Sequence, residues 1–159
     1  MLNKLKQAKE EWGGALSIID NWLDARQKLV ILYCQLAGLP PYQDQKKGLP
    51  QQALITEFCQ LLLDYASTGH FEIYHQIIAQ SKLDGEENLK IAQELYSRIT
   101  TTTDIALNFN DTYAEDASDQ AMLNFDQDLS RLGEVIESRF EREDQLLEIV
   151  HLHHTLSIT

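Results

Sequence analysis

Apolar residues recur at intervals of three and four positions along almost the whole chain, and they rarely alternate with polar ones. That spacing is the period of an amphipathic α-helix and leaves no convincing candidate for a β-strand. The 159 residues, 43% of them apolar, are enough to bury one ordinary hydrophobic core. We therefore predict an all-α fold built as a single domain over residues 1–159.

Helix-capping and helix-breaking residues divide this periodic pattern into separate helices. Ser17 is a candidate N-cap, Gly38 with the prolines that follow it stops the first long helix, and Gly69 ends or kinks the second. The predicted helices cover residues 17–37, 51 to about 69, 70–80, 87–113 with a weak point at the four threonines 100–103, and 119–154. Short connections predict an antiparallel helical bundle, with a four-helix-bundle-like core and an additional short helix.

The charge balance limits the classes of partner. The chain carries 25 acidic and 13 basic residues, a formal net charge of −12, so its field repels nucleic acid and favours a basic partner. No apolar run approaches the roughly 20 residues of a membrane span, and the first residues lack the apolar centre of a secretion signal. We expect a cytoplasmic protein without membrane contact. Cys34 and Cys59 are predicted to be buried reduced thiols, with a disulfide as the alternative.

Two charged residues fall near the middle of stripes that are otherwise apolar. Arg26 lies on the apolar face of the first helix and Glu143 on that of the last, where Arg139 borders the same face. A charge on a core-facing stripe must find a partner, because an isolated buried ion is very unfavourable. We predict that Arg26 and Glu143 meet, directly or through Arg139 and Asp64. A structural ion-pair network and a polar cleft that also serves a ligand or partner both fit this pattern.

Motifs for catalysis and for cofactors are absent. The chain has no GxSxG, GxxxxGK[ST] or GxGxxG sequence, so we predict a binding protein rather than an enzyme, with no cofactor. His70 and His75 are five residues apart, a poor spacing for helical metal ligands. A hemerythrin-like metal-binding bundle, using these histidines and the later "RFERED", is the alternative.

Three blocks carry a resemblance to a known family. They are "WLDARQKLVILYCQLAG" (residues 22–38), "FCQLLLDYASTGHFEIYHQI" (58–77) and "LGEVIESRFEREDQLLEIV" (132–150). In sequence, order and spacing they resemble the regulator of sigma D family, also called Rsd/AlgQ. The middle block is the most specific, and the segment from 81 to 120 matches less distinctly.

The resemblance implies an all-helical anti-sigma factor that binds region 4 of the housekeeping sigma factor, sigma-70. In that family, capture of region 4 prevents its contacts with the promoter −35 element and with RNA polymerase, which regulates transcription as growth slows. Region 4 contains a basic helix-turn-helix, and the acidic character of this chain agrees with such a partner. Further regulatory protein partners are compatible with the family.

The candidate site residues stand within the shared blocks. For partner binding they are Asp64, Tyr65, His70, Phe71 and Tyr74, and for the polar cleft beneath they are Arg26, Arg139 and Glu143. The aromatic side chains would supply contact area and Asp64 would pair with a basic residue of sigma. The alternative for each aromatic is ordinary core packing, and for Asp64 it is a solvated surface charge or a partner of the Arg26 cluster.

Overall fold

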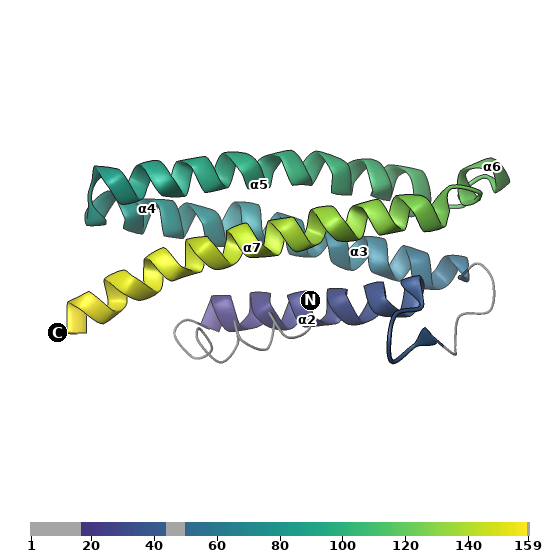
Figure 1. Cartoon of the computed structure of the whole chain (residues 1–159), viewed down its shortest axis with the longest axis horizontal. Coiled ribbons are helices and arrows are strands. Elements are labelled where there is room, and N and C mark those ends of the chain that lie inside the picture. The colour runs from purple at the N-terminus through teal and green to yellow at the C-terminus, as the bar shows by residue number, and fades with distance from the viewer. Residues whose placement is uncertain (1–16, 44–49, 159) are drawn as a thin grey trace.

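In the computed structural model the described residues are 17–43 and 50–158, and every regular element within them is a helix. The helices are α2 (Ser17–Ala37), α3 (Gln52–Thr68), the π-helix η2 (Gly69–Ile73), α4 (Tyr74–Asp84), α5 (Glu86–Tyr113), α6 (Asp119–Met122) and α7 (Phe125–Ile158). Figure 1 shows an elongated bundle in which α3, η2 and α4 form one continuous run between α2 and α5, with α7 along its length. The predicted all-α bundle is confirmed.

The first described helix ends where the sequence predicts. Helix α2 covers Ser17–Ala37, and Gly38 follows it with a φ of +67°, a left-handed conformation that favours glycine. The amide of Leu39 then donates to the carbonyl of Cys34 at 3.0 Å, which satisfies a carbonyl at the helix end. Helix α2 packs against α3 and α7.

The prediction that a second helix ends or kinks at Gly69 and a third begins at His70 needs correction. Gly69 keeps right-handed helical angles, φ −56° and ψ −52°, and the chain passes through η2 into α4 without a loop. A methyl group at Gly69 would lie 2.8 Å from Oη of Tyr74 and 3.4 Å from Cζ2 of Trp22. Gly69 therefore permits a close approach of side chains and does not act as a helix stop.

Helix α5 runs unbroken through its four consecutive threonines. The Oγ1 atoms of Thr100, Thr101 and Thr102 donate to backbone carbonyls three or four residues earlier, at 2.9, 2.7 and 2.6 Å. These bonds give the hydroxyl groups partners within the helix, so the segment predicted to be weak stays helical. Gly85, at a φ of +120°, makes the tight connection from α4 into α5.

The predicted single helix over residues 119–154 is wrong, because the chain is divided into α6 and α7. Ser118 caps α6 by accepting a hydrogen bond from the amide of Ala121 at 3.1 Å. After Met122 the chain turns, and Asn124 donates to the carbonyl of Ala121 at 3.0 Å. Helix α7 then begins at Phe125, whose fully buried ring fixes the start of the helix on the core, and it continues to Ile158.

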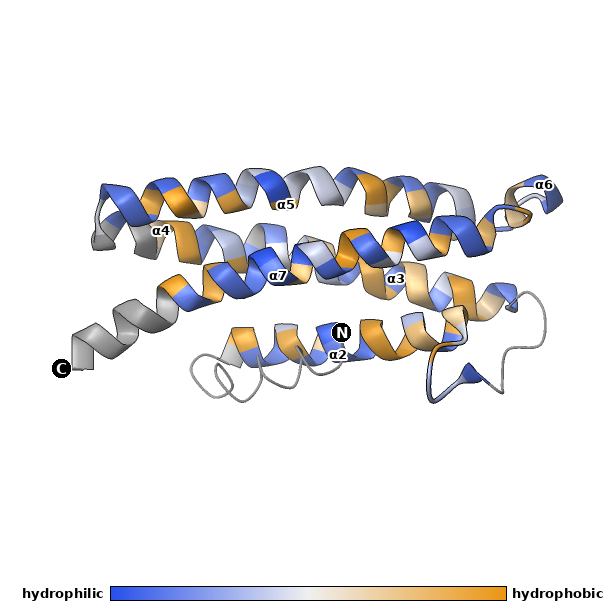
Figure 2. Cartoon of the chain, viewed as in Figure 1, coloured by the Kyte–Doolittle hydropathy of each residue, from blue (hydrophilic) through white to orange (hydrophobic). Residues whose placement is uncertain are grey.

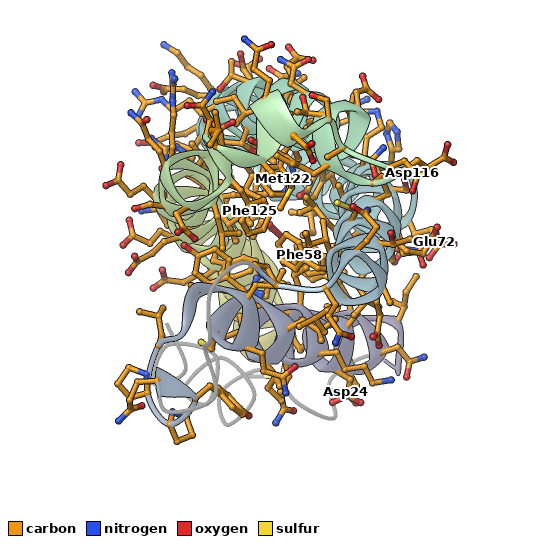
Figure 3. All side chains as sticks on the ribbon, turned by 90° about the vertical axis from the view of Figure 1, so that its right-hand side faces the viewer. Asp24, Phe58, Glu72, Asp116, Met122 and Phe125 are labelled. Atoms are coloured by element: carbon orange, nitrogen blue, oxygen red, sulfur yellow. The ribbon has the colours of Figure 1, made fainter. Side chains whose placement is uncertain are left out.

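The core lies along the axis of the bundle. Figure 2 shows hydrophobic residues interspersed with hydrophilic ones along each helix, as expected for amphipathic helices. In the end-on view of Figure 3, Phe58 and Phe125 lie between the helices, whereas Asp24 and Asp116 lie at the periphery. Cys34 and Cys59 are buried and free, as predicted. Among the described residues no helix is long and apolar enough to cross a membrane.

Candidate functional site

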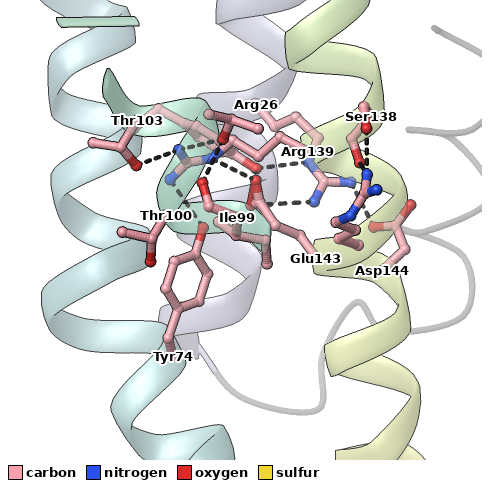
Figure 4. A network of polar contacts seen from close by, with 12 residues as sticks. Arg26, Tyr74, Ile99, Thr100, Thr103, Ser138, Arg139, Glu143 and Asp144 are labelled. Carbon is pink, nitrogen blue, oxygen red and sulfur yellow. Dashed lines mark hydrogen bonds and ion pairs between the residues drawn. The ribbon is translucent and has the colours of Figure 1, made fainter. Parts of the chain in front are cut away.

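A buried cluster of polar side chains occupies the middle of the bundle and joins five helices. Its charged members are Arg26 on α2 and Arg139, Glu143 and Asp144 on α7. The uncharged members are Tyr65 on α3, Tyr74 on α4, and Thr102 and Thr103 on α5. We call this set the polar cluster. Figure 4 shows Arg139 and Glu143 projecting from α7 toward Thr103 and Tyr74.

Glu143 is the buried carboxyl group of the polar cluster, with none of its surface exposed. Its Oε1 accepts a hydrogen bond from Nε of Arg139 at 3.0 Å, and its Oε2 accepts one from the hydroxyl of Tyr65 at 2.6 Å. Nη2 of Arg26 lies 3.7 Å from the same Oε2. Both carboxyl oxygens therefore have partners, which is the condition under which a protein tolerates a buried acid.

Arg139 connects α7 to both α4 and α5. Besides Nε on Glu143, its Nη2 donates to the hydroxyl of Tyr74 at 2.9 Å. Its Nη1 donates to Oγ1 of Thr103 at 2.9 Å and of Thr102 at 3.2 Å. A planar guanidinium can direct donors to several helices at once, whereas a lysine ammonium cannot reproduce this arrangement.

Arg26 connects α2 to α3 and α7. Its Nε donates to the hydroxyl of Tyr65 at 3.0 Å, and its Nη1 donates to Oδ1 of Asp144 at 2.7 Å. The guanidinium also lies over two aromatic rings, 5.2 Å from the centroid of Trp22 and 4.6 Å from that of Phe140. The contacts of the Arg26 guanidinium with the two rings and with the carboxylates together offset its loss of hydration.

Burial and mutual charge set the protonation behaviour of the cluster. Burial alone would lower the pKa of Arg26, but contacts with Tyr65, Glu143 and Asp144 raise it above its ordinary value, so the guanidinium stays charged. Burial raises the pKa of the Tyr65 hydroxyl well above its ordinary value, which keeps the proton that it donates to Glu143. Burial also raises the pKa of the Glu143 carboxyl, although Arg139 and Arg26 act to lower it. Burial therefore favours the neutral form of the Glu143 carboxyl, whereas the two arginines favour its charged form.

The structure confirms the meeting of Arg26 and Glu143 that the sequence predicted, and it corrects how they are linked. Arg139 contacts Glu143 as proposed, but Asp64 does not take part in the contacts described for the cluster. Asp64 is exposed on α3 and accepts a hydrogen bond from Nε2 of Gln60 at 3.0 Å. Tyr65, the next residue, takes the place expected for Asp64, because it faces the core at this turn of the helix.

Other members of the polar cluster were not found from the sequence. Thr102 and Thr103 lie three and four residues after the buried Ile99, and Ala106 lies a further turn along the helix. This i, i+3, i+4, i+7 pattern places the threonines on the core-facing stripe of α5, and that signal could have revealed them. Asp144 borders the apolar stripe of α7 and is 27% exposed, so its position in the sequence does not distinguish it from an ordinary surface acid.

The candidate partner-binding residues divide into exposed and buried groups. Asp64 is exposed and His70 is half-buried, with Nδ1 of His70 lying 3.2 Å from the hydroxyl of Tyr96. Tyr65 and Tyr74 are 2% and 1% exposed, so they match the alternative of core packing and lie beneath this surface. The side chain of Phe71 lies outside the described part of the chain.

No group of three or more His, Cys, Asp or Glu side chains among the described residues is arranged to hold a metal ion. His70 and His75, the histidines considered for a metal site, have ring centroids 6.0 Å apart in an edge-to-face arrangement. His70 also stacks on Tyr96, with centroids 5.6 Å apart. These contacts describe an aromatic group at the outside of the bundle.

Comparisons with known proteins point to one family over nearly the whole length of this chain. Residues 1–151 match the family described as "Regulator of RNA polymerase sigma(70) subunit, Rsd/AlgQ". A protein of Yersinia enterocolitica named "Regulator of sigma D" is 35% identical over 149 residues, which cover 93% of this chain and 89% of that protein. A protein of the same name from Salmonella newport is 38% identical over 151 residues, covering 94% and 91% of the two chains.

Proposed function

The chain belongs to the Rsd/AlgQ family of regulators of the RNA polymerase sigma-70 subunit, and from this premise we propose that it is an anti-sigma factor that binds sigma region 4. Capture of region 4 would keep it from the promoter −35 element and from RNA polymerase, and would lower sigma-70-dependent transcription as growth slows. The proposal assigns no catalytic step and no cofactor to the protein. It treats residues 1–159 as one domain that works in the cytoplasm, where the transcription machinery is.

The observation that carries the proposal is the match to one family over residues 1–151. Charge gives independent support, since region 4 reads DNA through a basic helix-turn-helix and this chain has a formal charge of −12. Complementary charge speeds association and discriminates against unsuitable partners. An acidic surface bound to region 4 would occupy the basic residues that otherwise contact DNA phosphates, so the protein would compete directly with the promoter.

We place the contact with region 4 on the outer surface where α3 continues into η2. Asp64 and Glu72 are both exposed there, and His70 lies half-buried between them in the chain. Asp64 would accept a charge-assisted hydrogen bond from a sigma arginine or lysine. The proposal keeps Phe71 as an aromatic contact on the same segment.

Tyr65 and Tyr74 would support this surface from below. The hydroxyl of Tyr65 donates to Glu143, and that of Tyr74 accepts from Arg139, so each tyrosine fixes its helix to α7. His70, Phe71 and Glu72 lie between the two tyrosines and Asp64 directly precedes Tyr65, so contacts with the polar cluster hold the helix at both ends of this segment. In this proposal Arg26, Arg139 and Glu143 organise the site and Asp64 touches the partner.

A binding measurement with purified sigma region 4 tests the proposal. We expect a 1:1 complex at micromolar concentrations whose affinity falls with added salt. Asp64→Asn should weaken it about two- to fivefold through loss of one exposed charge pair. Glu87→Gln, which neutralises another exposed acidic side chain near the start of α5, is the control and should leave the affinity unchanged. Absence of any complex would refute the function, whereas equal effects of the two substitutions would refute the placement of the surface.

A further inference from the structure

A hollow opens between α5 and α7 near the end of the bundle that carries α6. It has a volume of about 240 Å³. Its floor is formed by Ile105, Phe109 and Leu132, and its rim by Asn108, Thr112 and Arg131. Phe109 and Leu132 are 6% and 1% exposed, so the floor is part of the hydrophobic core, whereas the three rim residues are exposed. We call this feature the α5–α7 hollow.

The segment that surrounds the hollow is the most acidic part of the chain. Between residues 104 and 134 there are eight acidic residues and one basic residue, Arg131. This stretch therefore holds more than half of the formal charge of −12. The acidic residues are Asp104, Asp111, Glu115, Asp116, Asp119, Asp126, Asp128 and Glu134. A cationic partner would be drawn to this end of the bundle.

Three of these acidic residues, Asp111, Glu115 and Asp116, lie at or just beyond the end of α5 and do not stabilise it. Asp119, Asp126 and Asp128 lie instead in the first turns of α6 and α7, where negative charge is favourable. Helix α5 has no basic residue in its last turn, which contains Asp111, and Glu115 and Asp116 follow immediately after Tyr113 and Ala114. The C-terminus of a helix carries partial negative charge, so acidic residues there are unfavourable. A chain selected only for stability would place lysine or arginine at these positions. Residues that break a local rule of this kind are expected where a surface serves a partner.

We propose that the α5–α7 hollow is a docking site for a basic amphipathic helix of a partner protein. One apolar side chain of that helix would enter the hollow and pack on Phe109 and Leu132. Its basic residues would face Asp128, which lines the hollow, and the acidic residues that adjoin the rim in the sequence, Asp111 and Glu115. The volume of about 240 Å³ lies below the roughly 300–1,000 Å³ of small-molecule sites and suits a single anchoring side chain.

Two other occupants fit less well. The acidic field disfavours nucleic acid, and it also disfavours the same surface of a second copy of this chain, because like charges would face each other. Leu123 adds apolar surface at this end of the bundle, since its side chain is 83% exposed on the turn between α6 and α7. An exposed leucine among acidic residues suits a partner helix that is basic on one face and apolar on the other.

This site is separate from the surface proposed for region 4. In Figure 1 the α6 end of the bundle lies at the right, whereas α3 passes into α4 near the middle. In the view onto that end, Asp116 projects outward beside α6. The inference therefore goes beyond the proposed function and does not depend on it.

The test uses the full chain and a designed helical peptide of lysine and leucine, with leucine on one face only. NMR of the ¹⁵N-labelled protein should show the largest shifts at residues 105–113 and 128–132. Asn108→Trp, which fills the hollow from its rim without changing the charge, should weaken binding at least tenfold. Largest shifts at η2, or unchanged affinity of this variant, would overturn the proposal.

Matched charge substitutions separate the site from general acidity. Asp111→Asn with Glu115→Gln should weaken peptide binding about 2- to 30-fold, on the basis of two exposed charge pairs. The control pair Glu86→Gln with Glu87→Gln removes two equally exposed charges at the opposite end of α5 and should change affinity less than twofold. Equal weakening by both pairs would overturn the proposal. So would loss of region 4 binding in Asn108→Trp with retention in Asp64→Asn, because the hollow would then be the sigma site.

Discussion

Replacing Arg139 by methionine tests whether the polar cluster holds the bundle together. Arg139 donates hydrogen bonds to Glu143, Tyr74, Thr103 and Thr102 at 2.9–3.2 Å. Methionine fills much of the same space but donates none of them, and it leaves the Glu143 carboxyl with Arg26 at 3.7 Å as its remaining positive neighbour. Removing one partner of a buried pair costs about 3–5 kcal/mol of unfolding free energy.

The chain offers an exposed arginine–glutamate pair as a control, with the acid before the arginine rather than after it. Arg98 contacts Glu94, four residues away, at 3.0 Å, the same spacing and distance as Arg139 and Glu143. The surface pair is 58% and 63% exposed, whereas the cluster pair is 5% and 0% exposed. Arg98→Met should therefore cost no more than about 0.5 kcal/mol, because water screens an exposed pair and solvates what remains.

Urea unfolding followed by far-ultraviolet circular dichroism measures both variants. The expected loss for Arg139→Met corresponds to a fall in Tm of about 6–20 °C for a chain of this size. Arg139 lowers the pKa of Glu143, so its removal raises that pKa further. When the pKa of a carboxyl group is higher in the folded state than in the unfolded state, the protein loses stability as pH rises from the unfolded-state pKa through the folded-state pKa. The destabilisation caused by Arg139→Met should therefore be larger at pH 7.5 than at pH 5. Equal costs for the two arginine variants would refute the reasoning.

Two further predictions concern close packing and a buried thiol. Gly133→Ala would make its methyl group clash with the hydroxyl oxygen of Tyr33 and should lower stability by about 0.5–2 kcal/mol despite the helical preference of alanine. Thermal unfolding in a Tyr33→Ala background should show this loss abolished, and its persistence would contradict the steric explanation. Burial raises the pKa of Cys59 from 9.0 to about 11, so the folded state keeps the thiol proton to higher pH than the unfolded state does. The contribution of Cys59 to stability should therefore fall by about 2–3 kcal/mol as pH rises from 9 to 11. Urea titrations of the wild type and Cys59→Ala should show a smaller alkaline loss in the variant, and iodoacetamide should label the native thiol at pH 8.5 only after unfolding.

Helix positions were largely predictable because they depend on local pattern. Gly38 marks the end of α2 with local chemistry, and the structure agrees with it. The division after Met122 was not predictable in the same way, since Leu123 and Asn124 do not break a helix by themselves. There the burial of Phe125 against the rest of the core decides where α7 begins, and that contact is a property of the assembled bundle.

The polar cluster was predictable in its charges and not in its geometry. A charge on an apolar stripe is visible in the sequence, so the helical pattern alone predicts that Arg26 and Glu143 pair, and the two side chains do meet. Which neutral groups complete the pairing depends on how the helices rotate against one another. Tyr65 rather than Asp64 enters the cluster for that reason. The partner-binding role of Asp64 and His70 stays a prediction.

The π-helix determines which way the side chains beyond it point. Tyr65 and Tyr74 are nine residues apart, and at about 100° per residue an uninterrupted α-helix would set them on opposite sides. One π turn accommodates one extra residue, which reduces their separation to about 80° and lets both hydroxyls reach the same cluster. Deleting one residue between Gly69 and Ile73 would therefore leave an ordinary α-helix that still presents Tyr74 to Arg139. Adding one residue would rotate Tyr74 away from Arg139 unless a second π turn formed. In this protein the single π turn of η2 sets the rotation of α4 relative to α3, and therefore which side chains of α4 face the core.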